Sequence, residues 1–227
     1  MPVILGFDTA TPDTVAAVTG AGETVEVSYP PGEDGRPTAG RVLLAAIEEV
    51  VAAAGGWPAI DLIAVGVGPG SFTGLRIGVS TGRALAQGHD LPLAGVSTTS
   101  ALALGIAASP AAAGRNRLAV VDARRGEVFA ALDRGEGPSE PRACPPEELA
   151  GTFGAEEVRG ALAAGDGSVR FRSEIEAQGA EVPEPSDPAH RLYARHICSL
   201  ASGAEPGPAE LVTPNYVRRP DAKRWDG

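Results

Sequence analysis

The segment Gly68-Pro69-Gly70-Ser71-Phe72-Thr73-Gly74-Leu75-Arg76-Ile77-Gly78 joins a strand to a helix and sets the order of the elements around it. It follows the apolar run 62–67, which is typical of a buried strand, and leads into a helical pattern over 73–87. Two interpretations of this turn are open. Backbone N–H groups at the start of the helix could hold an anion such as a phosphate, through a loop made of Gly68, Gly70, Ser71 and Thr73. Alternatively, the glycines only permit a sharp turn and close packing of the helix.

Composition limits the class of protein. The chain has 227 residues, of which 43% are hydrophobic, so it can form one large domain or two small ones. No apolar run reaches the roughly 18 residues of a membrane-spanning helix. The segment 1–8 has no basic start, which argues against a secretory signal, and Cys144 and Cys198 are expected to be reduced, buried thiols. We therefore expect a cytoplasmic protein.

The formal net charge is −10. Proteins that bind nucleic acid by themselves are usually basic, because most of their affinity comes from phosphate contacts. This chain is not expected to hold RNA or DNA firmly alone. It could still serve a nucleic-acid enzyme by binding a partner.

The first part of the chain predicts an antiparallel meander, with strands at 3–7, 14–18 and 23–27. A helix is predicted at 39–54, and Thr38 could cap it. A surface helix normally shows one apolar stripe, but the apolar positions of this helix extend well beyond one face. We expect burial on two sides, by the helix's own sheet and by something else.

The second predicted helix, 73–87, carries Gly74, Gly78 and Gly82 at intervals of four, which places them in one stripe without side chains. Each glycine costs the helix about 1 kcal/mol relative to alanine. The close approach of another surface should offset that cost. The surface could belong to the same domain or to another molecule.

A weak internal repeat links the two halves of the chain. The strand 118–122 ends in Asp122, a tight turn follows, and a second strand covers 127–132, as the strand ending at Asp8 is followed by a turn and a strand. The actin and sugar-kinase fold begins each of its two lobes in this way. The fold class is therefore predicted to be α/β and two-lobed, actin-like and sugar-kinase-like, with duplicated mixed-sheet lobes at 1–109 and 110–227.

The end of the chain gives weaker patterns. A helix is predicted within 157–164, a strand at 169–171 and an amphipathic helix at 189–202. One face of that last helix is predicted to contain Leu192, His196 and Leu200, with Ile197 beside it. An extended tail over 213–220 is expected to pack at Tyr216 and Val217, and the last helix and tail could return to the first lobe.

No catalytic constellation is apparent. The glycine segment lacks the lysine of a Walker motif, Ser71 lacks the setting of a nucleophile elbow, and the three histidines have no metal-ligand spacing. An actin-like nucleotide site could be built from Asp8, Thr9 and Asp122. However, the hairpin after Asp8 contains no glycine, and Pro12 has no N–H to donate. We interpret Asp8 and Thr9 as positions of a degraded phosphate hairpin.

Five segments together resemble the TsaB (YeaZ) family, and the resemblance covers nearly the whole chain. They are the glycine segment 68–78 and the runs Ile4-Leu5-Gly6-Phe7-Asp8-Thr9-Ala10-Thr11, Gly95-Val96-Ser97-Thr98, Asp122-Ala123-Arg124-Arg125-Gly126-Glu127-Val128-Phe129 and Pro214-Asn215-Tyr216-Val217-Arg218. The resemblance is weakest over 138–188. Family members often carry Arg-x-His before the first helix, where this chain has Arg36-Pro37-Thr38, so a role of that histidine is not carried over.

The resemblance implies a function in making threonylcarbamoyladenosine next to the anticodon of tRNAs that read ANN codons. It implies a non-catalytic subunit that supports a TsaD-like catalytic paralogue, with a TsaE-like ATPase as a further partner and tRNA contacted only through the complex. It implies no cofactor of the chain's own, with nucleotide at the interface between subunits as an option, and a homodimer in isolation. The implied partner surface consists of the two predicted helices, with candidate residues Val42, Leu43, Ala46, Ile47, Val50, Gly74, Gly78 and Gly82.

Two alternatives from other classes stay open at this point. One is an actin-like ATPase or small-molecule kinase. The other is a homodimeric scaffold with no role in tRNA modification.

Overall fold

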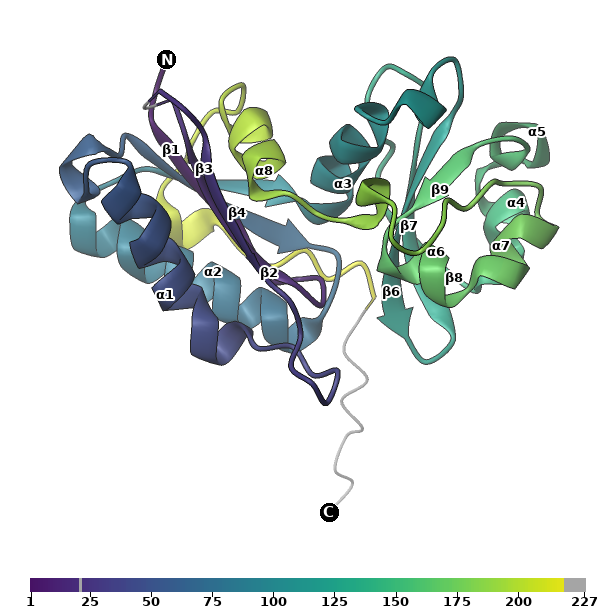
Figure 1. Ribbon diagram of the computed structural model, residues 1–227, viewed down its shortest axis with the longest axis horizontal. Coiled ribbons are helices and arrows are strands. Elements are labelled where there is room, and N and C mark those ends of the chain that lie inside the picture. The colour runs from purple at the N-terminus through teal and green to yellow at the C-terminus, as the bar shows by residue number, and fades with distance from the viewer. Residues whose placement is uncertain (21, 219–227) are drawn as a thin grey trace.

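Two mixed β-sheets, each covered by helices, lie side by side in the computed structural model, which describes residues 1–20 and 22–218 (Figure 1). The first sheet has the order β3-β2-β1-β4-β5, from strands β1 Ile4–Asp8, β2 Thr14–Thr19, β3 Val25–Tyr29, β4 Leu62–Gly68 and β5 Leu93–Ser97. β1, β2 and β3 are antiparallel neighbours, which confirms the predicted meander, and β4 runs parallel to β1 and β5.

The second sheet repeats this pattern with the order β8-β7-β6-β9. Its strands are β6 Arg117–Arg124, β7 Glu127–Asp133, β8 Arg142–Cys144 and β9 Leu162–Ala164. β6, β7 and β8 are antiparallel, and β9 is parallel to β6. A single parallel bridge from Leu162 to Glu181 occupies the place of a fifth strand. The duplicated, two-lobed actin-like and sugar-kinase-like α/β fold is confirmed.

Side chains along the strands of the first sheet point alternately to its two faces, and each face packs in a separate hydrophobic core. Leu5, Phe7, Ile63 and Val65 pack under α1 (Ala39–Ala53) and α2 (Phe72–His89) on one face. Ile4, Leu62 and Ala64 point to the other face, which is covered by α3 (Thr98–Ala107) and α8 (Ala194–Ala201). The core around α3 and α8 continues into residues of the second sheet, such as Val121 and Phe129, so the two lobes share one buried cluster.

Short helices cover the outer face of the second sheet (Figure 1). They are α4 Leu149–Phe153, α5 Ala155–Val158, α6 Asp166–Arg170 and α7 Arg172–Ala177. Single 3-10 turns lie at Trp57–Ala59, Pro110–Ala112, Pro146–Glu148, Pro188–His190 and Ala209–Leu211. None of the described helices is both long enough and apolar enough to span a membrane.

Several local predictions were wrong. Thr38 does not cap α1, because its hydroxyl donates to the carbonyl of Pro30. The helix predicted within 157–164 is a short helix followed by strand β9, and the predicted strand 169–171 lies largely in α6. In place of 189–202, α8 covers Ala194–Ala201. Its buried residues include Ile197 and Cys198, and Leu200 is partly buried against the same core. The part of the predicted tail at 219–220 lies outside the described residues.

Candidate functional site

The glycine segment is hydrogen-bonded to the first hairpin, between β1 and β2. Gly68 ends β4, Ser71 caps α2 by accepting from the N–H of Gly74 at 3.3 Å, and the N–H of Ser71 donates to the carbonyl of Ala10 at 2.7 Å. The hydroxyl of Thr9 donates to the carbonyl of Gly74 at 2.7 Å. The turn after β1 is therefore bonded to the start of α2, although more than sixty residues separate them in sequence.

Asp8 is fully buried where the degraded phosphate hairpin was predicted. Its two carboxylate oxygens accept from the N–H of Ala10 at 2.6 Å and from the hydroxyl of Thr98 at 2.7 Å. Burial raises the pKa of Asp8 to about 6, against these hydrogen bonds, which lower it. A Cβ atom at Gly66 would lie 1.7 Å from a carboxylate oxygen of Asp8, so glycine leaves the space in which the carboxylate sits. Asp8 and Thr9 thus serve the internal structure of the lobe.

The stripe of Gly74, Gly78 and Gly82 faces the chain's own sheet, not a partner. A Cβ atom would lie 1.9 Å from the Thr9 carbonyl oxygen at Gly74, 2.5 Å from the Thr9 hydroxyl at Gly78, and 3.4 Å from Phe7, Val65 and Leu93 at Gly82. All three glycines are buried. Of the two predicted explanations, packing within the domain is the one that the structure shows, and the assignment of these glycines to a partner surface was wrong.

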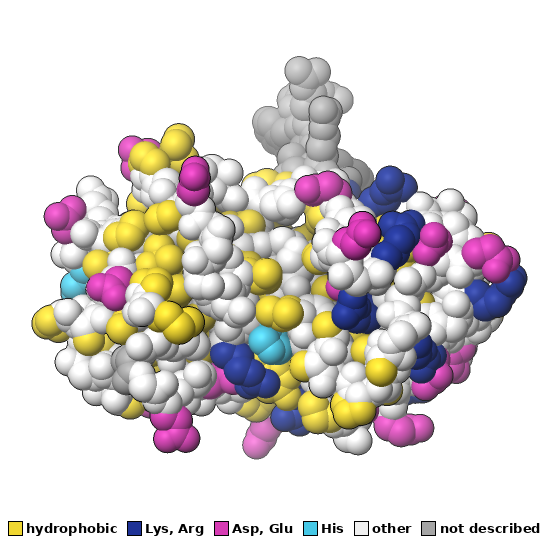
Figure 2. Space-filling view, turned by 90° about the horizontal axis from the view of Figure 1, so that it is seen from above, with side chains coloured by type: hydrophobic (Ala, Val, Ile, Leu, Met, Phe, Trp, Pro, Cys, Tyr) yellow, Lys and Arg dark blue, Asp and Glu magenta, His cyan; other side chains and the backbone are white. Residues whose placement is uncertain are grey.

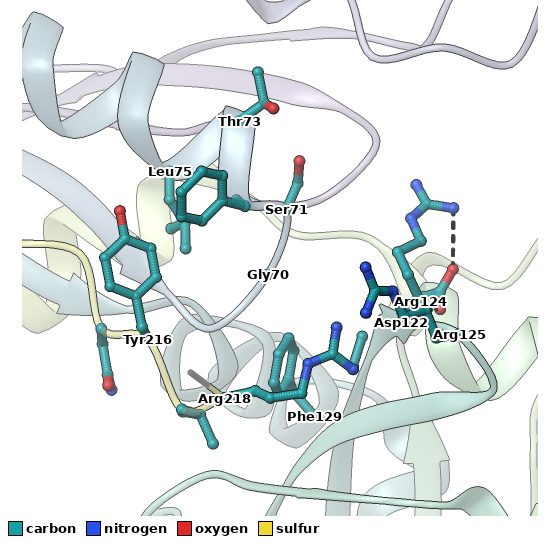
Figure 3. A pocket seen from close by; sticks show the side chains of 14 residues that line it. Gly70, Ser71, Thr73, Leu75, Asp122, Arg124, Arg125, Phe129, Tyr216 and Arg218 are labelled. Carbon is teal, nitrogen blue, oxygen red and sulfur yellow. Dashed lines mark hydrogen bonds and ion pairs between the residues drawn. The ribbon is translucent and has the colours of Figure 1, made fainter. Parts of the chain in front are cut away.

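Two different roles are found in the predicted anion loop of Gly68, Gly70, Ser71 and Thr73. Gly68 has φ +99° and lies against Leu75 and the carbonyl of Asn215, so it belongs to the turn. Gly70, Ser71 and Thr73, by contrast, line a cavity of about 530 Å³ between the lobes. Figure 3 shows this cavity, with Tyr216 of the tail on one side and Arg124 and Arg125 on the other.

The second hairpin, between β6 and β7, carries Arg124 and Arg125, which line the cavity. Asp122 accepts from the N–H of Arg124 at 2.8 Å, as Asp8 accepts from Ala10, which repeats the turn of the first lobe. Its carboxylate also pairs with the guanidinium groups of Arg124 at 3.1 Å and Arg170 at 2.9 Å. Asp166 lies close by and accepts from the N–H of Asp122, and burial raises its pKa to about 6.

Sequence analysis identified Asp122 but missed the cavity residues Phe72, Arg124, Arg125, Tyr216 and Arg218 as a group. They come from three segments that only the fold brings together. One local signal was available, since Arg125 stands in a two-residue hairpin turn, at a position that favours glycine or asparagine.

Comparison with known proteins gives consistent matches. The model of the family TsaD, tRNA N6-adenosine threonylcarbamoyltransferase, matches residues 40–137. A tRNA threonylcarbamoyladenosine biosynthesis protein TsaB from Haemophilus influenzae is 35% identical over 127 residues, which are 56% of this chain and 51% of that protein. A solved structure of YeaZ from Pseudomonas aeruginosa has a TM-score of 0.77 at 26% identity, with 95% of this chain and all of the other covered. Another, described as similar to peptidase YeaZ from the same organism, has a TM-score of 0.80 at 27% identity, with coverage of 96% and 100%.

The chain is similar to proteins of the TsaB (YeaZ) family. The chain spans about half the length of the curated relatives that it matches, with 51% of the Haemophilus influenzae protein aligned.

The predicted partner surface of this chain needs a second correction, in the first helix. Leu43, Ala46, Ile47 and Val50 are buried in the core under α1, so they are unavailable to a partner. Val42 is half-buried. The outward side of α1 carries Leu44 instead, which is 61% exposed, and the neighbouring Ala45. The prediction selected the apolar helix and assigned the wrong face of it.

Side chains of different kinds gather on different lobes. In the view of Figure 2, hydrophobic side chains cover much of the first lobe, and most of the basic side chains lie over the second. Large exposed hydrophobic residues of the first lobe include Leu44 and Phe72. On this face, the first lobe therefore offers the more apolar surface to another protein.

Proposed function

We propose that this chain is a partner subunit in the biosynthesis of threonylcarbamoyladenosine in tRNAs that read ANN codons. In this proposal it supports a TsaD-like catalytic subunit and does not perform the transfer. A TsaE-like ATPase joins the two, and tRNA is contacted through the complex. The proposal rests first on similarity to proteins named tRNA threonylcarbamoyladenosine biosynthesis protein TsaB.

The burial of Asp8 and Thr9 in the first hairpin is the observation that favours a non-catalytic, supporting subunit. Asp8 is fully buried, and Asp8 and Thr9 are both engaged in hydrogen bonds within the lobe. Gly74 and Gly78 of the glycine stripe pack against Thr9, so this residue is enclosed within the lobe. An actin-like ATPase or kinase binds phosphates with that hairpin. The arrangement here therefore argues against an ATPase or kinase activity. The net charge of −10 also argues against tRNA binding by the chain alone.

Reconstitution tests the proposal. The purified chain is mixed with its TsaD-like and TsaE-like partners, threonylcarbamoyl-adenylate, ATP and unmodified tRNA, and the modified nucleoside is measured by mass spectrometry. We expect modification only when the chain is present, and none from the chain alone. Full activity of the partners without the chain would contradict the proposal, as would ATP turnover by the isolated chain.

The outward side of α1 is the proposed contact surface for the TsaD-like partner, and for a second copy of the chain in isolation. Exposed leucine at the centre of an interface contributes through desolvation, and an introduced carboxylate there would be buried without a partner. We expect Leu44→Asp to weaken binding to the TsaD-like subunit at least about tenfold, with little change in stability because the side chain is 61% exposed. Titration calorimetry and chemical denaturation measure the two effects.

Leu104→Asp is the matched control. Leu104 is 37% exposed and lies on α3, which covers the opposite face of the first sheet. Its replacement should leave the affinity unchanged. Equal loss of affinity in both variants, or unchanged affinity in Leu44→Asp, would remove the α1 surface from the proposal.

A further inference from the structure

The tail of the chain, which follows α8, contacts both lobes. It lies along the first lobe, and the part that the structure describes ends at Arg218, between the lobes (Figure 1). The chain crosses from the first sheet to the second after α3, over residues 108–116, and returns to α8 over residues 183–193. The tail therefore adds a non-covalent connection between the lobes to these two covalent ones.

The attachment of the tail to the first lobe is close. Leu93 of β5 forms an antiparallel bridge with Gly207, and Val212 packs against the core under α1 and α2. The N–H of Asn215 donates to the carbonyl of Val67 at the end of β4, at 2.7 Å. Backbone bonds and apolar packing thus hold the tail on the first lobe as far as Asn215.

The attachment to the second lobe is weaker. Arg218 pairs with Glu127 at the start of β7, and these side chains are 30% and 35% exposed. Before this ion pair, Val217 is partly buried against the cluster that the lobes share, and Tyr216 contacts Phe72 of α2 with ring centroids 5.3 Å apart. A partly exposed ion pair is screened by salt and contributes little by itself. The end of the tail at Arg218 is therefore the end that can detach.

The same segment forms one wall of the cavity between the lobes. Residues 215–218 line it together with the start of α2 and the hairpin between β6 and β7. In Figure 3 the tail passes along one side of the cavity, with Phe129 beside Arg218. α3 contacts β4 and β5 of the first sheet and β6 and β7 of the second, so a rotation about α3 would move the cavity walls apart. The tail opposes that rotation, because it is attached on both sides.

We propose that residues 213–218 form a releasable strap that holds the two lobes closed over the cavity. The strap stays on the first lobe and detaches from the second when the pair of Arg218 and Glu127 breaks. Because that attachment is weak, a change in ionic strength is enough to alter the fraction of molecules that are closed. The released state exposes Phe129, which is only 6% exposed in the closed one. This strap is a property of the chain alone and does not depend on the function proposed above.

The distance between the lobes, measured in the full chain by double electron–electron resonance, tests the proposal. Spin labels are attached through Gly88→Cys on α2 and Gly151→Cys on α4. Both positions are exposed, and nothing lies within 4 Å of a Cβ atom at either. Cys144 and Cys198 are buried, so the label reacts with the introduced thiols.

Arg218→Glu in the labelled chain places a like charge against Glu127 and should detach the strap. We expect the mean distance to increase by more than about 2 Å, a change that exceeds side-chain adjustment. Adding Glu127→Arg restores the attraction with the charges reversed, and the distance should return to that of the parent. Arg218→Gln removes the charge without repulsion and should cause a smaller increase. Raising the salt from about 0.1 M to about 1 M should lengthen the distance in the parent and have little effect in Arg218→Gln.

Arg134→Glu is the matched control. Arg134 pairs with Glu157, both residues belong to the second lobe, and their side chains are 51% and 39% exposed. The distance between the lobes should stay that of the parent. Exchange protection of the Ile63 amide, which donates to the carbonyl of Pro92, shows that each variant is folded. If Arg218→Glu loses this protection, Arg218→Gln and the salt dependence decide the question.

Three results would overturn the proposal. They are an unchanged distance in folded variants at Arg218, an equal increase in Arg134→Glu, and no recovery when Glu127→Arg is added to Arg218→Glu. These measurements need no partner protein, so their outcome is distinguishable from a failure of the reconstitution.

Discussion

Gly74→Ala is expected to lower the free energy of unfolding by about 3 kcal/mol, at the upper end of the range for overpacked cores. The new Cβ atom would lie 1.9 Å from the carbonyl oxygen of Thr9 and 2.9 Å from its carbonyl carbon. Both are backbone atoms of the hairpin after β1, which cannot move aside without breaking the hydrogen bond from Ser71 to Ala10. Urea denaturation of parent and variant measures the loss.

Gly88→Ala in the same helix provides the control. Nothing lies within 4 Å of a Cβ atom at Gly88, and the residue is exposed near the end of α2. Alanine there should raise stability by about 0.5–1 kcal/mol, since glycine is the poorer helix former. If Gly74→Ala were as stable as the parent but no longer associated with partners, the stripe would face another molecule and the packing described here would be wrong.

The glycine stripe shows which structural features a sequence pattern predicts and which it does not. Its interval of four established that one side of the second helix lacks side chains, and the cost of glycine in a helix established that some surface must approach closely. The identity of that surface depends on Thr9, which lies more than sixty residues earlier. Periodicity contains no information about which distant segment fills the space, so the domain and a partner were equally consistent with it.

The first helix was misassigned for a related reason. Leu43 and Leu44 are adjacent in sequence and chemically identical, yet the first is buried and the second is 61% exposed. Because apolar residues extend beyond one face, the pattern does not define which stripe meets the sheet. The excess of apolar positions predicted an apolar outer side, where the exposed Leu44 lies, and the direction of each side chain required the coordinates.

The weak repeat of strand, aspartate, turn and strand indicated a duplicated domain, and both copies use the same local bonding. Asp8 and Asp122 each accept from the backbone N–H two residues later. The outer helices of the second lobe were harder to predict. α5 and α6 have four and five residues, and helices of that length are stabilised by packing rather than by their own sequence.

The buried aspartates lead to the second large effect, which is on the pH dependence of stability. The pKa of Asp8 is raised from 3.8 to about 6, and burial is the main cause. Between these two values the unfolded chain has released the proton and the folded chain retains it. The folded state then binds more protons, so its stability falls as the pH rises from about 4 to about 6 and is constant with respect to this group above that window. Asp166 has the same sign and the same window.

Asp8→Asn isolates the contribution of one group. The amide oxygen can accept from the N–H of Ala10, and the amide nitrogen can donate to the hydroxyl of Thr98, which keeps the shape of the site. The hydroxyl proton of Thr98 loses its acceptor, and this adds an offset that does not depend on pH. The difference in unfolding free energy between variant and parent is therefore expected to shift by about 2 kcal/mol in favour of the variant between pH 4 and pH 7.

Urea denaturation at intervals of pH, with Glu23→Gln as the control, measures this shift. Glu23 is exposed on the loop before β3, so its replacement should leave the difference from the parent the same at every pH. Other carboxylates titrate in both proteins and cancel in the subtraction. A difference between Asp8→Asn and the parent that did not change from pH 4 to pH 7 would mean that Asp8 is solvated in the folded state. The space that Gly66 leaves for its carboxylate would then be open to water, and the first hairpin would not be closed to a phosphate.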